Sequence, residues 1–280
     1  MRIVILASSV YSETACAMAV RMAELGYVPT GALALRTLNR KSMLRKLGQW
    51  GGREIAKFAL TKFPHPSHSR PGAHNSYLLP LLEHNGGYFR SLRQVAASYG
   101  FPVTVVNDQN ALDSIAQLKN WSPDLIIFTG GNILRTPVLD LPRLGVINVH
   151  LGLLPEIRGM SAPEWSLLSH VLVGVTVHYM DAGIDTGPVL QRCEFPDTAQ
   201  CESLSDLRNR LIAFGVEKAA DVVTALDRGT ICAVPQFELS NNENKEKDNQ
   251  FYVMHEWLQA RAAECLAESR TAAEVGAANG

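Results

Sequence analysis

Short and almost wholly apolar runs alternate along the chain with segments in which apolar residues recur at helical spacing. The first apolar run, Ile3 to Ala7, precedes a segment with helical spacing from Thr14 to Leu25. Strand-like residues then return from Tyr27 to Leu35. A strand, a helix and a second strand in this order predict a parallel sheet, because parallel strands need a crossover connection that is usually a helix.

The same alternation continues through most of the chain. We predict further strands at 101–106, 125–129, 145–150 and 173–179, and helices at 40–62, 111–118 and 203–227. Apolar runs of four to eight residues that alternate with longer periodic segments are typical of strands and helices in an α/β protein. The predicted fold class is therefore α/β, with a mostly parallel sheet and flanking helices.

The composition changes after Pro235. Residues 241–248 form a polar, charged linker, and an amphipathic helix is predicted from Phe251 to Glu268. Its expected apolar anchors are Tyr252, Trp257, Leu258 and Leu266. We expect the small residues from 271 to 280 to be disordered. The chain is thus divided into residues 1–235, which form the main domain, and residues 236–280, which form a linker and a short helical extension.

Composition narrows the classes of function. The 280 residues are 46% hydrophobic with a formal net charge of -1, which is enough to bury one substantial core but gives no electrostatic footprint for nucleic acid. The five cysteines include no C-x-x-C pair, so a reducing, cytoplasmic compartment is expected. No apolar run is long enough to span a membrane, so no membrane partner is expected.

Two local clusters have competing interpretations. Basic residues gather between Arg36 and Lys57, where a solvated helix face is favoured over an anion site. The histidines His65, His68 and His74 lie in a Pro/Ser-rich loop. Such a loop gives no rigid ligand geometry, so a solvated loop is favoured and no metal site is predicted.

Polar side chains occur where two of the predicted strands end. Asn148 and His150 are two residues apart on one strand and therefore point to the same side, and Asp185 lies in the turn 181–187 after another strand. An amide, an imidazole and a carboxylate suit acyl transfer to an amine, which needs an oxyanion donor, a proton-shuttling ring and a base. The alternatives are hydrogen-bonded structural residues, and a calcium loop at 181–187, which has too few oxygen ligands at alternate positions.

The segment 129–134 follows another predicted strand and contains Gly130 and Gly131. It is either an ordinary strand-to-helix turn or a backbone wall for a flat heterocycle. No G-x-G-x-x-G pattern follows the first strand and no P-loop pattern occurs, which disfavours dinucleotide binding and phosphoryl transfer.

Taken together, these motifs resemble those of the folate-dependent formyltransferases, the family of the glycinamide ribonucleotide, methionyl-tRNA and sugar N-formyltransferases. The resemblance extends over about residues 1–235 and is strongest from 124 to 191. The motifs that carry it are Leu141–His150, Leu153–Pro155, Arg158–Gly159, Gly174–Val177 and Met180–Gly187. It implies a Rossmann-like catalytic domain, 10-formyltetrahydrofolate as the formyl donor and a primary amine as the acceptor.

The resemblance also implies roles for individual residues. Asn148 would donate to the developing oxyanion, His150 would polarise the formyl group or relay a proton, and Asp185 would receive the amine proton. The residues implied for cofactor binding are Gly131, Asn132, Ile133, Leu134, Asp181 and Gly183. For His178 a structural role is preferred.

The chain departs from the family pattern at Leu151–Gly152, where many members carry Pro-Ser, Pro-Gly or Gly-Ser. Residues 36–100 match no assigned pattern, and we expect them to shape acceptor specificity. We expect a small-molecule amine acceptor, such as an amino sugar or amino acid, rather than tRNA. The reasons are the neutral net charge and a tail after residue 240 that is too short for the C-terminal domain of the tRNA enzyme. A homodimer stays open. The rival functions are a 10-formyltetrahydrofolate hydrolase, disfavoured because the chain begins at the first strand, a methionyl-tRNA-type enzyme without the full C-terminal domain, and a non-enzymatic folate-binding protein or scaffold.

Overall fold

The computed structural model describes residues 1–37, 75–239 and 250–278. In this part of the chain the strands are β1 (Ile3–Ala7), β2 (Gly31–Leu35), β3 (Glu83–His84), β4 (Gly87–Tyr88), β5 (Val103–Val106), β6 (Leu125–Phe128), β7 (Gly145–His150), β8 (Arg158–Gly159), β9 (Gly174–Tyr179), β10 (Val189–Glu194) and β11 (Gln250–Phe251). The helices are α1 (Glu13–Glu24), α4 (Leu79–Leu82), α5 (Leu92–Tyr99), α6 (Leu112–Trp121), α7 (Thr136–Leu139), α8 (Ala162–Leu168), α9 (Leu204–Asp227), α10 (Gln236–Leu239) and α11 (Glu256–Ala278), with a 3-10 turn at Thr198–Gln200. The helix predicted at 40–62 and the three-histidine loop lie outside the described residues.

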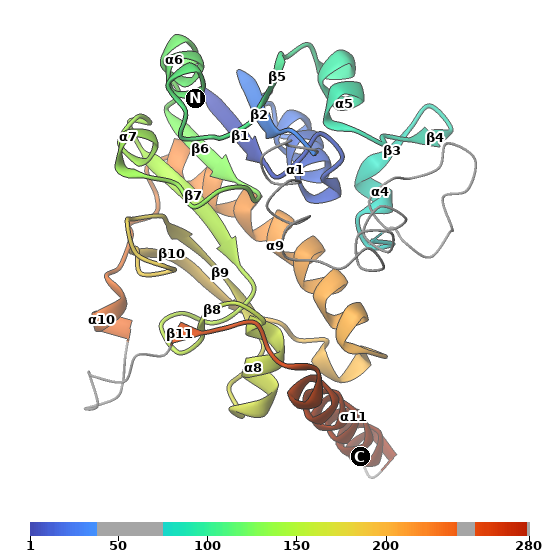
Figure 1. The fold of residues 1–280 in the computed structure, drawn as a ribbon. Coiled ribbons are helices and arrows are strands. Elements are labelled where there is room, and N and C mark those ends of the chain that lie inside the picture. The colour runs from blue at the N-terminus through green and yellow to red at the C-terminus, as the bar shows by residue number, and fades with distance from the viewer. Residues whose placement is uncertain (38–74, 240–249, 279–280) are drawn as a thin grey trace, which may run out of the picture.

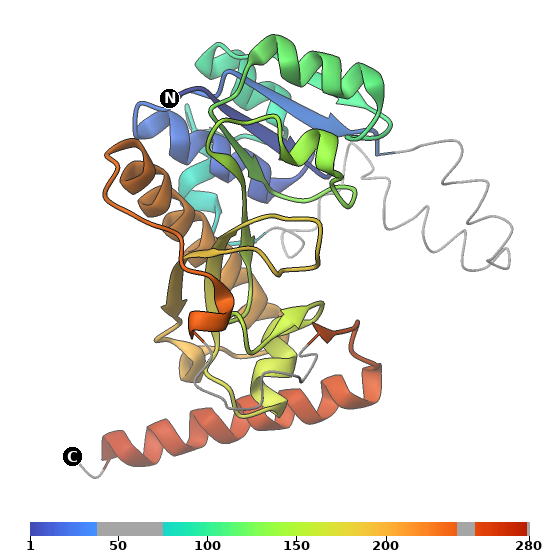
Figure 2. The ribbon, with the colours of Figure 1, turned by 90° about the vertical axis from the view of Figure 1, so that its left-hand side faces the viewer.

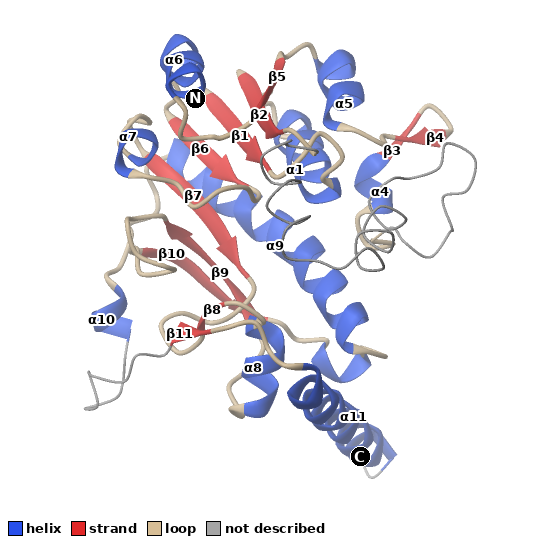
Figure 3. Cartoon of the chain, viewed as in Figure 1, coloured by secondary structure: helices blue, strands red, loops and turns tan. Residues whose placement is uncertain are grey.

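Seven of the described strands form one sheet in the order β10-β9-β7-β6-β1-β2-β5. The five strands from β5 to β7 are mutually parallel, and β9 and β10 are added antiparallel at the β7 edge. Figure 1 shows the sheet running through the molecule, and Figure 3 shows helices around it. The predicted α/β class, with a mostly parallel Rossmann-like sheet and flanking helices, is confirmed.

Strand β1 shows why its sequence is apolar throughout. All five of its residues are buried. Ile3 and Ile5 pack in the core cluster that contains α1 and α9, whereas Val4 and Leu6 pack in a second cluster that contains residues of α6 and α7. A parallel strand covered on both faces has no solvated side, so it loses the alternation of polar residues that an edge strand keeps.

The antiparallel half of the sheet is covered by α9. This 24-residue helix begins at the N-cap Ser203, whose side chain accepts a hydrogen bond from the Asp206 backbone N–H. It packs on β7, β9 and β10. Arg208 of α9 forms a two-pronged ion pair with Glu164 of α8, with distances of 2.6 and 2.7 Å, and the Glu164 side chain is only 3% exposed. The ion pair therefore joins α8 to α9.

The C-terminal helix differs from its prediction. It begins at Glu256 and extends to Ala278, so the disorder expected from residue 271 to that point is wrong. Tyr252 precedes the helix and Trp257 lies in its first turn, and both are 75% exposed rather than anchors. The expected anchor Leu266 is buried, together with Ala262 and Cys265. Helix α11 packs on α8 and the 3-10 turn. Figure 2 shows α11 running beneath the sheet. No helix in the described residues is long and apolar enough to cross a membrane.

Candidate active site

The pairing of β7 with β9 places four polar side chains on one face of the sheet. In this antiparallel pair Asn148 is opposite His178, and His150 is opposite Thr176. Residues two apart on a strand share a face, and directly opposed residues lie within side-chain reach. The amide and the imidazole that the sequence placed on one side are therefore joined there by a second imidazole and a hydroxyl from β9.

The turn after β9 brings the carboxylate to this face. Asp185 has a positive φ of 53°, and its Oδ2 accepts a hydrogen bond of 2.9 Å from the Gly159 backbone N–H. A Cβ at Gly187 would collide with the Tyr179 carbonyl oxygen, so that glycine allows a close approach of two backbones. The positive φ in this turn belongs to Asp185 and not to Gly183 or Gly187.

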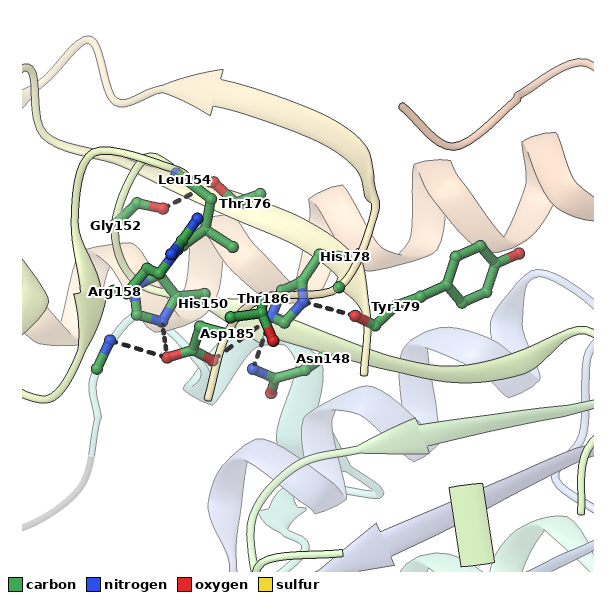
Figure 4. A network of polar contacts seen from close by, with 12 residues as sticks. Asn148, His150, Gly152, Leu154, Arg158, Thr176, His178, Tyr179, Asp185 and Thr186 are labelled. Atoms are coloured by element: carbon green, nitrogen blue, oxygen red, sulfur yellow. Dashed lines mark hydrogen bonds and ion pairs between the residues drawn. The ribbon is translucent and has the colours of Figure 1, made fainter. Parts of the chain in front are cut away.

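Asp185 lies between the two imidazole rings, as Figure 4 shows. Its Oδ2 is 3.4 Å from His150 Nδ1, and its Oδ1 is 3.6 Å from His178 Nε2. The side chain of Asp185 is 16% exposed, whereas His150 and His178 are 6% and 1% exposed. The three groups thus form a mostly buried cluster with one member that solvent reaches.

The protonation of His150 follows from its neighbours. Its Nε2 lies 2.7 Å from the Ile157 carbonyl oxygen, which can only accept a hydrogen bond, so Nε2 carries a proton. Its Nδ1 then faces the Asp185 carboxylate. Two acceptors repel each other at this distance, and a proton between them makes the contact favourable. The arrangement therefore suits the uptake and release of one proton.

His178 has the opposite tautomer. Its Nδ1 lies 2.8 Å from the Tyr179 carbonyl oxygen and donates to it, which leaves Nε2 free to accept from Asn148 Nδ2 at 3.3 Å. Burial lowers the pKa of His178, against the attraction of Asp185. A neutral His178 thereby holds the Asn148 amide in one orientation and leaves its second N–H available to a ligand.

The loop after His150 is held against β9 by Thr176. The Thr176 hydroxyl donates to the Gly152 carbonyl oxygen at 2.7 Å and accepts from the Leu154 N–H at 3.0 Å. A Cβ at Gly152 would lie 3.0 Å from His150 Nε2, which is tighter than nearly all real contacts. The Leu151–Gly152 departure thus places a glycine where the loop approaches the imidazole.

The residues predicted to bind the cofactor have different environments. Gly131 and Asn132 follow β6, which neighbours β7, and the Asn132 side chain and backbone are both bonded to Gln109. The Ile133 side chain is 78% exposed and available to a ligand. Leu134 is 3% exposed and packs in the core cluster with α6 and α7, so little of this residue is open to a ligand.

The two predicted cofactor residues of the turn are exposed. The Asp181 carboxylate accepts from the Gly183 N–H at 3.0 Å and from the Thr186 hydroxyl at 2.6 Å, so it holds the turn together. A Cβ at Gly183 would collide with that hydroxyl. Both residues therefore shape the loop that carries Asp185.

The contacts of His178 fit the structural role preferred for it, whereas Gln236 was not predicted as a site residue. The signal for His178 was its place in G-V-T-V-H-Y, where two polar residues alternate with apolar ones on a buried strand. Gln236 has no local signal. Its amide nitrogen donates to the carbonyl oxygens of Asp185 and Gly187, both at 2.8 Å, across about fifty residues of chain.

Comparisons with known proteins give a family match for part of the chain. Residues 92–223 match the family model described as formyl transferase. The methionyl-tRNA formyltransferase of Koribacter versatilis (strain Ellin345) is 38% identical over 151 residues, which are 53% of this chain and 48% of that protein. The chain thus spans about half the length of the curated relatives it matches.

Solved structures share the fold. Glycinamide ribonucleotide transformylase 1 from Symbiobacterium toebii superposes with a TM-score of 0.52 at 17% identity, covering 82% of this chain and 89% of that one. A sugar N-formyltransferase from Shewanella sp FDAARGOS_354 gives a TM-score of 0.56 at 13% identity, covering 95% of this chain and 87% of that one.

The matched segment indicates the class of protein. The resemblance to the folate-dependent formyltransferases is confirmed for residues 92–223, which match the formyl transferase family model. The expectation that tRNA is not a partner is wrong, because the curated relatives are methionyl-tRNA formyltransferases. That expectation relied on net charge, which averages over the whole surface, whereas nucleic-acid binding depends on local basic patches.

Proposed function

We propose that this protein transfers a formyl group from 10-formyltetrahydrofolate to a primary amine. The observation that carries the proposal is the contact of 3.4 Å between His150 Nδ1 and Asp185 Oδ2, beside an Asn148 amide with one N–H still to donate. The family match of residues 92–223 supports the same reaction. The proposal is falsified if no formylated product is detected with any amine tested.

The site residues supply three of the needs of this reaction. Asn148 donates a hydrogen bond to the formyl oxygen as it gains negative charge. Asp185 takes the proton that the amine must lose to become a good nucleophile, and His150 shares that proton. The donor would supply the activated formyl group on a flat pteridine, for which the exposed Ile133 at the neighbouring strand end offers an apolar contact.

We propose two acceptor classes in order. Methionyl-tRNA comes first, because the curated relatives carry that name. A small primary amine such as an amino sugar or amino acid comes second, because a solved structure that shares the fold is named a sugar N-formyltransferase.

The test is release of tetrahydrofolate by the purified protein, followed by absorbance, with product identified by mass spectrometry. Release that depends on methionyl-tRNA, or on one of a panel of small amines, supports transfer and names the acceptor class. Release that needs no amine indicates a hydrolase instead.

A variant pair ties the activity to the site. Asn148→Ala is expected to lower kcat by about 10²–10³, which is the usual loss for one oxyanion donor. The control is Ser166→Ala, which removes a buried hydroxyl of α8 that bonds the Ala162 carbonyl oxygen at 2.9 Å. If the two variants lose activity equally, Asn148 has no special role.

A further inference from the structure

Gln236, the first residue of α10, bridges two backbone segments of the site through its side-chain amide. The residue is 5% exposed. Its Nε2 donates to the carbonyl oxygens of Asp185 and Gly187, both at 2.8 Å, and its Oε1 accepts from Arg158 Nε at 3.1 Å. A guanidinium only donates and a carbonyl only accepts, so this orientation of the amide satisfies all three neighbours.

The residue that Gln236 holds has an unfavourable backbone conformation. A left-handed conformation is unfavourable for a residue with a Cβ, and it persists where the surroundings impose it. At Asp185 two contacts impose it, since Gln236 binds the carbonyl oxygen and the Gly159 N–H binds the carboxylate. Without the first contact, residue 185 can return to a negative φ, which turns its carboxylate away from His150.

The second contact also depends on the C-terminal part of the chain. Strand β8, which contains Gly159, pairs with β11, and the Met160 N–H donates to the Phe251 carbonyl oxygen at 2.9 Å. A Cβ at Gly159 would collide with that same oxygen, so the two strands meet closely there. Gln236 and β11 both lie beyond the residues 92–223 that match the family model.

We propose that Gln236 is a positioning residue for formyl transfer, and that it acts by holding the Asp185 backbone so that the carboxylate faces His150. The inference rests on the proposed function. If Gln236 were purely structural, replacing it would lower the stability of the fold. If Gln236 positions Asp185, replacing it also lowers kcat by more than the loss of stability explains.

The variant Gln236→Met keeps the length of the side chain and removes its donors and acceptor. Gln236→Glu keeps the acceptor for Arg158, removes the donors to the two carbonyls and adds a negative charge there. The matched control is Gln259→Met, because Gln259 also donates from its side-chain amide to a backbone carbonyl, that of Met254 at 3.0 Å, in the same C-terminal region.

Rates are measured at saturating donor and amine, with Tm and the Kd for 5-formyltetrahydrofolate measured in parallel. We expect both Gln236 variants to lose at least tenfold in kcat with a Kd within about threefold of wild type, and Gln259→Met to keep its kcat. Equal kcat in all four proteins overturns the inference. A loss of kcat in Gln236→Met but not in Gln236→Glu also overturns the inference, because both variants lack the donors to the two carbonyls.

A spectroscopic measurement separates this inference from the proposed function. ¹⁵N-histidine NMR reports the ring nitrogens of His150, of which Nδ1 faces Asp185. If wild type transfers no formyl group, the proposed function fails, and the inference is then decided by whether these signals move in Gln236→Met but not in Gln259→Met. Unchanged signals overturn it, and so does the failure of both Gln236 variants to fold, which would assign the residue a structural role.

Discussion

Replacing Asp185 by Asn isolates the charge of the carboxylate. Asn has the same shape, and its Oδ1 can still accept the hydrogen bond from the Gly159 N–H that now reaches Oδ2 at 2.9 Å. The variant therefore keeps the turn and removes the negative charge that lies 3.4 Å from His150 Nδ1.

The separation of these two atoms sets the size of the effect. Unit charges 3.4 Å apart attract by about 5 kcal/mol at an effective dielectric constant of 20. The proton reaches this pair only as the amine attacks, so much of that attraction belongs to the transition state rather than to the resting enzyme. A loss of about 3–4 kcal/mol corresponds to a decrease of about 10²–10³ in kcat.

The assay is single-turnover formyl transfer at saturating amine, followed from pH 7 to about pH 9.5. If Asp185 takes the amine proton, the gap between wild type and Asp185→Asn narrows as pH rises, because more of the amine is already neutral in solution. Asp221→Asn, an exposed surface change on α9, serves as the control. A decrease of less than fivefold, or a gap that does not change with pH, would refute the assigned role of Asp185.

Three further predictions concern the fold. Arg208→Met leaves the Glu164 carboxylate buried without its partner and is expected to lower the free energy of unfolding by about 3–5 kcal/mol, measured by urea denaturation. The backbone N–H of Arg2, with the side chains of Arg2 and Arg143, lowers the pKa of Asp124 to about 2. The ionised Asp124 therefore stabilises the fold above the unfolded pKa, and this stabilisation is lost as pH falls from about 4 to 2. Asp124→Asn should flatten the acid limb of a curve of unfolding free energy against pH and cost about 1–2 kcal/mol at pH 7. Burial, followed by the charge of Glu13, raises the pKa of Cys16 to about 12, so its thiol should resist iodoacetamide at pH 8 until urea unfolds the protein, as peptide mass spectrometry would show.

Most of the regular structure could be predicted because its signals are local. The strand predicted at 145–150 matches β7, and the helix predicted at 203–227 differs from α9 by one residue. The C-terminal helix was misplaced because Tyr252 and Trp257 were taken as anchors by their hydrophobicity alone. Which face of a helix is buried depends on the neighbours that pack against it, and those neighbours, α8 and the 3-10 turn, are far away in the sequence.

The candidate site divides in the same way. The period of two along a strand was enough to place Asn148 and His150 on one face. The 3.4 Å contact between Asp185 and His150 depends on the tertiary structure. It forms because β9 runs antiparallel to β7 and because Asp185 adopts a positive φ in the turn that follows β9. No local pattern encodes either condition.

The sequence by itself determined the alternation of strands and helices, the parallel character of the sheet and the pair of polar side chains at the end of β7. These follow from periodicity and from the backbone geometry that periodicity selects. The tertiary structure alone decided which carboxylate meets which ring, that His178 orients the Asn148 amide, and that Gln236 holds the acidic turn. Contacts between residues thirty to fifty positions apart depend on how whole elements pack, so they arise only when the chain has folded.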